Sequence, residues 1–204
     1  ITHGHEDHIG GLAYLLKQIN IPVYATKLTI GLIKGKLEEH GILNKAKLVE
    51  IKPRDNITLG AFNIEMIHVN HSIPGAVGLA LRCPAGVVIQ TGDFKIDTTP
   101  VDGDMIDLPR FAEFGKKGVL ALLSDSTNAE RPGTTMSERA VGESFELLFR
   151  KAGSRRIIVA TFASNIHRVQ QIVDVAAARN RKVAVVGRSL ENLVSVGAEL
   201  GYLN

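Results

Sequence analysis

Four side chains of the kind that bind divalent metal ions lie within the first eight residues, in the order His3, His5, Asp7 and His8. The two-residue spacing lets His3 and His5 face the same way from an extended loop, and the other two follow as the chain turns into a helix. Imidazole and carboxylate groups suit zinc. We therefore predict two adjacent ions, one on His3 and His5 and one on Asp7 and His8, with open positions for water. A chance cluster of surface histidines is the alternative.

Two later residues strengthen the prediction of a metal centre. His71 follows a predicted strand and is placed to complete a three-histidine set on the first ion. Asp93 follows Gly92 at another strand end, where a bridging carboxylate would neutralise two dications. Taken singly, His71 reads as a surface histidine and Asp93 as a turn residue after glycine. The neighbouring His68 is interpreted as structural.

The elements that must position these residues follow from hydrophobic periodicity and from Gly and Pro punctuation. Helical spacing runs from residue 9 to 19 and again from 28 to 40, and a further helix is predicted near 108–114. Short strands are predicted at 21–25, 48–51, 62–69, 77–82 and 86–90, and a buried strand at 119–123 that ends beside Asp125.

A second unit begins after a predicted linker at residues 130–135. Ser137 is expected to cap a helix, and two strands (157–161 and 183–186) then alternate with helices at 166–178 and 190–200, as in a parallel sheet. Because parallel strands end on one side of a sheet, the turns after these two strands should flank one cleft. Backbone N–H groups at the helix start would attract phosphate, and an aromatic ring there could stack on a base. We therefore predict a nucleic-acid site made by Phe162, Ser164, Asn165, His167, Arg168, Arg188 and Ser189. Alternatively, the two serines are plain helix caps and Phe162 belongs to the core.

Composition sets limits on the class of protein. The 204 residues are 45% hydrophobic, which suffices for a sizeable core, and the net charge of +3 is compatible with an anionic polymer without requiring one. The single cysteine, Cys83, excludes an internal disulfide framework and a cysteine-based zinc cluster. Neither a membrane helix nor a leader is recognised, so we predict a cytoplasmic protein without a membrane partner.

The metal motif is followed by segments that together carry a resemblance: His71-Ser72-Ile73-Pro74, Thr91-Gly92-Asp93-Phe94-Lys95, Leu123-Ser124-Asp125-Ser126-Thr127-Asn128 and Thr161-Phe162-Ala163-Ser164-Asn165-Ile166-His167-Arg168. The chain resembles the ribonuclease J family, in the β-CASP group of metallo-β-lactamase-fold hydrolases. This resemblance implies an α/β fold in two parts. Residues 1–134 are expected to form part of a metallo-β-lactamase αββα sandwich without its N-terminal strands, and residues 135–204 the start of a β-CASP parallel α/β domain. The chain is expected to be an internal fragment.

The same resemblance implies roles for the candidate residues. Two Zn²⁺ ions, or Mn²⁺, would be held by His3, His5 and His71 on one side and by Asp7 and His8 on the other, with Asp93 bridging. Asp7, His8 and Asp125 would act in catalysis, Asp125 together with a histidine beyond Asn204. The family's last zinc histidine would also lie beyond Asn204, so the fragment alone is expected to be inactive or impaired. Two positions depart from the family pattern, Gly75 in place of an acidic residue and Gln90 in place of histidine.

The resemblance further implies hydrolysis of RNA, by endonuclease and 5′-to-3′ exonuclease activity, in RNA processing and decay. The RNA is expected to carry a 5′-monophosphate, and a homo-oligomer is expected to form through regions outside this chain. One alternative is a hydrolase of the same fold that acts on a thioester or lactone, but the second unit, with Arg168 and Arg188 at its turns, argues against it. The other alternative is a metal-free RNA-binding subunit, and the complete set of six ligands argues against that.

Overall fold

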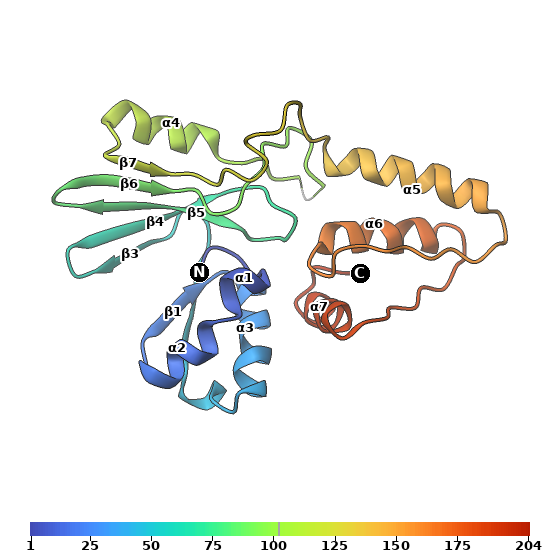
Figure 1. Ribbon diagram of the computed structural model, residues 1–204, viewed down its shortest axis with the longest axis horizontal. Coiled ribbons are helices and arrows are strands. Elements are labelled where there is room, and N and C mark those ends of the chain that lie inside the picture. Colours follow the sequence, from blue (N-terminus) through green and yellow to red (C-terminus); the bar gives the residue numbers. More distant parts are fainter. Residues whose placement is uncertain (102) are drawn as a thin grey trace.

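Figure 1 shows a computed structural model of the chain, in which residues 1–101 and 103–204 are described. Its largest sheet is five-stranded, in the order β3-β4-β5-β6-β7. The strands are β3 (Asn56–Leu59), β4 (Phe62–His68), β5 (Val77–Cys83), β6 (Gly86–Gln90) and β7 (Ala121–Leu123). Strands β3 to β6 form an antiparallel meander, and β7 joins parallel to β6. Strand β3 lies between the strands predicted at 48–51 and 62–69 and was not itself predicted.

The crossover from β6 to β7 contains helix α4 (Leu108–Lys117), which packs on one face of the sheet. Phe114 of this helix is buried against Ile67, Ala80 and Ile89. Successive residues of β4 point to opposite faces of the sheet. Ile67 packs under α4, whereas Met66 belongs to a separate buried cluster with Ile51. The sheet therefore buries apolar side chains on both faces.

The first 50 residues form a smaller layer below this sheet in Figure 1. Strand β1 (Pro22–Ala25) pairs in parallel with β2 (Lys47–Glu50), and the helical elements are α1 (Glu6–Ile9), α2 (Leu12–Gln18), α3 (Lys27–Glu39) and η1 (Leu43–Lys45). Apolar residues of α3, including Leu28 and Ile33, form the centre of the largest buried cluster. This cluster also contains Ile166 and Leu193, which come from the C-terminal part of the chain.

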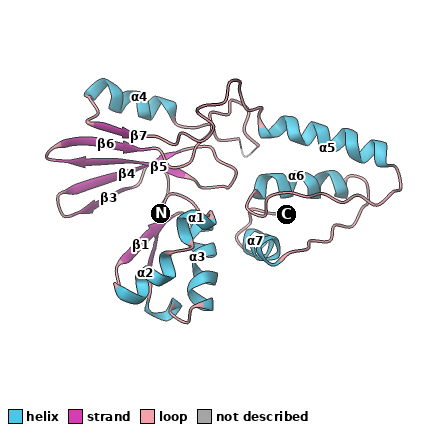
Figure 2. Cartoon of the chain, viewed as in Figure 1, coloured by secondary structure: helices cyan, strands magenta, loops and turns pink. Residues whose placement is uncertain are grey.

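The C-terminal part consists of helices α5 (Glu138–Ala152), α6 (Ile166–Ala177) and α7 (Arg188–Glu199) joined by long loops, as Figure 2 shows. Ser137 caps α5 as predicted, because its side chain accepts a hydrogen bond from the Arg139 N–H. Phe145 and Phe149 of α5 pack on Val175 of α6. The mixed α/β character predicted from the sequence is confirmed.

The two strands predicted in this second unit are wrong for the described residues, since 157–161 and 183–186 have no strand structure. A strand needs the backbone hydrogen bonds of a neighbour, and neither segment pairs with a described strand. Their apolar side chains are accordingly uncovered: Ile158 is 89% exposed and Val186 is 83% exposed. The parallel sheet expected here is therefore not formed within residues 1–101 and 103–204.

The prediction of a buried strand at residues 119–123 also needs correction. Strand β7 is shorter and pairs only with β6, so it is an edge strand among the described residues. Leu122 is 62% exposed and Leu123 is 57% exposed. The apolar residues of this segment correctly predicted a strand, but the burial of a strand depends on what packs against it.

Within the described residues, no helix has the length and apolar character needed to cross a membrane.

Candidate metal centre

The predicted metal ligands come from four loops or element ends that meet between the two sheets. His3 and His5 precede α1, which carries Asp7 and His8; His71 follows β4 and Asp93 follows β6. The N-terminal segment is held against the large sheet because the Val77 N–H donates to the Thr2 carbonyl over 3.0 Å. Residues distant in the sequence are thereby brought together.

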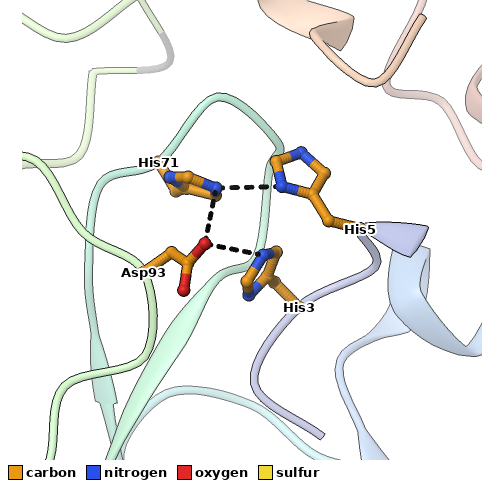
Figure 3. Close-up of side chains that lie close together, drawn as sticks. All are labelled: His3, His5, His71 and Asp93. Atoms are coloured by element: carbon orange, nitrogen blue, oxygen red, sulfur yellow. Dashed lines mark hydrogen bonds and ion pairs between the residues drawn. The ribbon is translucent and has the colours of Figure 1, made fainter. Parts of the chain in front are cut away.

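Three histidines and one carboxylate form a first cluster, drawn in Figure 3. One ligand atom each of His3, His5, His71 and Asp93 lies within 4.8 Å of the others. The Asp93 Oδ2 atom is 3.7 Å from His3 Nε2 and 3.8 Å from His71 Nε2. His71 Nε2 lies 3.0 Å from His5 Nδ1. The set that the sequence predicted for one ion is therefore assembled.

Asp7, His8 and Asp93 form a second cluster. His8 Nε2 is 3.5 Å from Asp7 Oδ2 and 3.4 Å from Asp93 Oδ1. Asp93 thus presents Oδ2 to the first cluster and Oδ1 to the second. One carboxylate facing two donor sets is the arrangement expected of a bridging ligand.

The unpaired Nε2 atom of His3 indicates whether these residues fit a metal ion. His3 is fully buried, and its Nε2 atom has no hydrogen-bond partner among the described residues. Its Nδ1 atom lies 3.1 Å from the Thr2 hydroxyl, which can hold the proton on Nδ1 and leave the Nε2 lone pair free. A buried polar atom without a partner costs about 1–3 kcal/mol, and a bound cation would satisfy it. The donor set therefore fits a divalent cation.

The histidines of the first cluster also have the protonation state that metal binding needs. Burial, and next the neighbouring His71, lowers the pKa of His3 to about 2. Burial, and next the neighbouring His5, lowers the pKa of His71 to about 4. Neutral imidazole is the form that ligates metals, so these rings are ready to bind an ion at neutral pH.

Two contacts to His5 were not predicted from the sequence. The Ser72 hydroxyl lies 3.3 Å from His5 Nε2, and the backbone of Ser164 lies close enough to the ring to raise the pKa of His5. Burial is the larger influence and lowers the pKa of His5 overall. Since Ser164 and His167 belong to the second unit, that unit lies beside the first donor cluster.

The glycine before Asp93 is required by the backbone. Gly92 has a φ of 62°, and a β carbon there would lie 2.8 Å from the Val77 carbonyl oxygen. Its N–H donates to the Gln90 side chain over 2.9 Å, so the residue that departs from the family pattern helps to hold this turn. At the other departure, Gly75 has a φ of 76° and approaches Thr26 closely.

Asp125 lies next to this centre without belonging to either donor cluster. Its carboxylate accepts hydrogen bonds from the Thr127 N–H at 2.9 Å and the Thr127 hydroxyl at 2.7 Å, and from the Phe94 N–H at 3.4 Å. Burial raises the pKa of Asp125, but these hydrogen bonds and the nearby His71 outweigh burial and lower it. Asp125 is therefore an ionised group beside the histidines.

The predicted RNA-binding residues that precede and begin α6 differ in their exposure and contacts. Phe162 is 79% exposed, so it is not a core residue. Asn165, and not Ser164, caps α6 by accepting the Arg168 N–H at 3.0 Å. His167 lines a cavity of about 60 Å³ together with His71.

The charged residues of the two turns differ in their pairing. Arg168 makes a two-pronged ion pair with Glu138, at 2.7 and 2.9 Å, which neutralises its charge. Arg188 and Ser189 are exposed in the first turn of α7, and Gly187 holds the cap position before them. Among the described residues, no contact connects Arg188 or Ser189 to the metal ligands.

Comparison with known proteins defines the class. Residues 1–125 match the model of the metallo-beta-lactamase superfamily, and residues 154–204 match that of the ribonuclease J beta-CASP domain. The chain therefore belongs to the metallo-β-lactamase superfamily.

Individual relatives narrow the resemblance to ribonuclease J. The chain is 50% identical to Ribonuclease J of Synechocystis sp. over 205 residues, all of this chain and 32% of that protein. It is 52% identical to Ribonuclease J 1 of Streptococcus pyogenes over 203 residues, all of this chain and 36% of that one. The chain thus spans about a third of the length of these relatives. A crystal structure of a protein of unknown function from Enterococcus faecalis shares the fold, with a TM-score of 0.65, 18% identity, and coverage of 90% of this chain and 44% of the other.

Proposed function

We propose that the chain supplies most of the catalytic centre of a ribonuclease J-type enzyme, which hydrolyses RNA phosphodiester bonds as a 5′-to-3′ exonuclease and an endonuclease. The observation that carries this proposal is the pair of donor clusters that share Asp93. The names of the relatives, similar over the whole chain, support RNA as the substrate.

The proposed cofactor is a pair of Zn²⁺ ions, or of Mn²⁺ ions. His3, His5 and His71 would hold one, Asp7 and His8 the other, and Asp93 both. When bound, such a pair supplies Lewis acidity, which activates water and stabilises charge on phosphoryl oxygens. A further ligand to the second ion is expected elsewhere in the complete gene product, so we propose that this chain alone is impaired.

The chain's own residues would complete the chemistry. The Asp7 side chain is 76% exposed, so besides binding metal with His8 it can accept a hydrogen bond from the attacking water and orient it. Asp125 is ionised and close to His71, where it would position the group that protonates the leaving oxygen.

The RNA would enter from the second unit. The exposed ring of Phe162 is suited to stack on a base, and the backbone N–H groups at the start of α6, from Ser164 to His167, would attract a phosphate. Asn165 and Arg168 would hold that turn in place, and Arg188 and Ser189 would extend the path. We propose that the RNA carries a 5′-monophosphate and that the enzyme acts in cytoplasmic RNA processing and decay as a homo-oligomer.

The proposed domain boundary lies between residues 134 and 135. It falls in the interval between the two family matches, which end at residue 125 and begin at residue 154. The first domain would supply the metal ligands and the second would guide the RNA.

Metal analysis and a substrate comparison on the complete gene product test this function. We expect close to two zinc or manganese ions per chain, and cleavage of a 5′-monophosphorylated RNA that His3→Ala abolishes. His40→Ala, which removes a partly exposed histidine bound to Lys17, is the matched control and should retain both properties. Absence of metal, or cleavage of a glutathione thioester while the RNA survives, would overturn the proposal.

A further inference from the structure

A polar junction connects the loop after Asp93 to the start of α5. Its members are Lys95, Asp97, Thr99, Ser137 and Glu138, and we call this set the 97–138 junction. Asp97 is 5% exposed and lies at its centre. None of these residues belongs to the donor clusters of the metal centre.

Asp97 holds both sides of the junction at once. Its Oδ1 atom accepts the Thr99 N–H at 3.0 Å, and its Oδ2 atom accepts the Glu138 N–H at 3.2 Å. Lys95 Nζ lies 3.4 Å from the same carboxylate and donates to the Met136 carbonyl over 2.8 Å. Ser137 returns a hydrogen bond to the Thr99 carbonyl at 2.8 Å. The first turn of α5 is therefore fixed to the loop that carries Asp93.

The junction continues into the turn that faces the metal centre. Glu138, the first residue of α5, pairs with Arg168 of α6 through two hydrogen bonds. Arg168 directly follows His167 in the first turn of α6. Glu138 and His167 also line the cavity that contains His71. The loop from Asp93 to Asp97, the Asp97–Glu138 bond and the Glu138–Arg168 pair thus link the metal centre to α6, and the shared cavity places α6 beside His71.

Apolar packing alone would leave the orientation of this unit poorly defined. Ile166 and Leu193 bury α6 and α7 against α3, but hydrophobic contact is non-directional. Hydrogen bonds to a buried carboxylate are directional, and charge-assisted ones are the stronger kind. The junction supplies such directional bonds between the loop after Asp93 and the helix that pairs with Arg168.

We propose that Asp97 is a positioning residue, which through the 97–138 junction fixes the 161–168 turn over the metal centre and so aligns a polymeric substrate with it. The inference rests on the proposed function for the identity of that substrate. Its structural part stands on contacts that are independent of RNA.

Asp97→Asn in the complete gene product tests the inference, because the amide retains the shape and loses the charge. We expect faster hydrogen exchange across residues 161–168 and unchanged metal content. We also expect about a tenfold or greater fall in kcat/KM for RNA, since a misplacement of about 1 Å can cost about 100-fold. Hydrolysis of bis(p-nitrophenyl) phosphate, a phosphodiester too small to span the turn, should stay within about twofold of the wild type.

Two further variants keep the test decisive. Ser137→Ala removes the Ser137–Thr99 bond and the cap of α5 but leaves the Asp97 carboxylate in place, and should show the same pattern more weakly if Asp97→Asn does not fold. Asp55→Asn alters another loop carboxylate that accepts a backbone N–H, from Lys52, and should leave every readout unchanged.

Each other outcome has a distinct meaning. Unchanged exchange at residues 161–168 in both junction variants overturns the inference, as does a parallel loss of metal and of activity on both phosphodiesters. If the wild type cleaves no RNA, the proposed function fails, and hydrogen exchange alone then decides whether the junction positions the turn.

Discussion

The two parts of the chain position their functional residues in different ways. In the first part, paired strands fix the loops that carry His71 and Asp93. In the second part, helices are joined by segments without strand structure, and a few polar contacts tie α5 and α6 to the loop after Asp93. A sheet supplies rigid placement of ligands, whereas the second unit depends on individual hydrogen bonds. Variants in the two parts should therefore fail differently.

The largest effect is expected from Asp93→Ala, which removes the carboxylate shared by both donor clusters. Metal content should fall, and kcat on RNA and on bis(p-nitrophenyl) phosphate should fall together by at least about 1000-fold, because several kcal/mol of electrostatic stabilisation are lost. Inductively coupled plasma mass spectrometry measures the metal content, and steady-state kinetics measure kcat on the two substrates. Retention of both ions would show that Asp93 does not bridge.

A large effect on stability is expected from Glu65→Ala in β4. Glu65 is 2% exposed and binds Arg110 at 2.5 and 2.7 Å and Arg82 at 2.5 Å. Removing it takes charge-assisted hydrogen bonds from two partly exposed guanidinium groups that keep Glu113 and Asn63 as partners, so the free energy of unfolding should fall by about 1.5–3 kcal/mol. Urea denaturation followed by circular dichroism checks this. A change below about 1 kcal/mol would contradict the role of this group in holding α4 to the sheet.

The same carboxylate predicts a pH dependence. Hydrogen bonds from Arg110 lower the pKa of Glu65, against burial, which raises it. A depressed pKa means that the stabilisation is complete above the unfolded-state value of about 4.3 and is lost as pH falls through the lower folded-state value. The stability difference between wild type and Glu65→Ala should therefore be constant near neutral pH and shrink in acid. Denaturation curves over a pH series would show a constant difference if the reasoning is wrong.

Phe162→Ala should act on RNA alone. Loss of one stacked base costs about 1–3 kcal/mol, so RNA affinity should fall about 5-fold to 150-fold, while the small phosphodiester is hydrolysed as before. Fluorescence anisotropy with a labelled 5′-monophosphorylated RNA measures the affinity. Phe62→Ala, which removes another exposed aromatic ring in β4, is the matched control. Equal losses in the two variants would argue against stacking.

The smallest effect is expected from Asn165→Ala, which removes the cap of α6. Loss of a helix cap costs about 1 kcal/mol, and the cost should appear as a modest drop in melting temperature. Calorimetry provides the measurement. A loss of metal in this variant would instead show that the cap supports the ligands directly.

The two donor clusters could be anticipated from the sequence because four of the six candidate ligands lie in one short motif, where their order is fixed by the spacing. His71 and Asp93 needed the additional expectation that strand ends converge. The contacts of Asp97 could not be predicted, since Glu138 lies on another element and no local pattern pairs them. The exposure of Leu122 and the lack of strand pairing at residues 157–161 could not be predicted either. Burial and strand pairing depend on which segments pack alongside, and not on the apolar residues themselves.

The helices α6 and α7 share a core with α3, and Gly31 marks how closely they approach. A β carbon at Gly31 would lie 2.8 Å from Val196 in α7. Cutting the chain at the proposed boundary, between residues 134 and 135, would expose Leu193 and Ile166 on one side and α3 on the other. The boundary therefore separates the proposed metal-binding and RNA-guiding parts, but it does not separate two units that fold independently. We expect α3, α6 and α7 to unfold in a single transition.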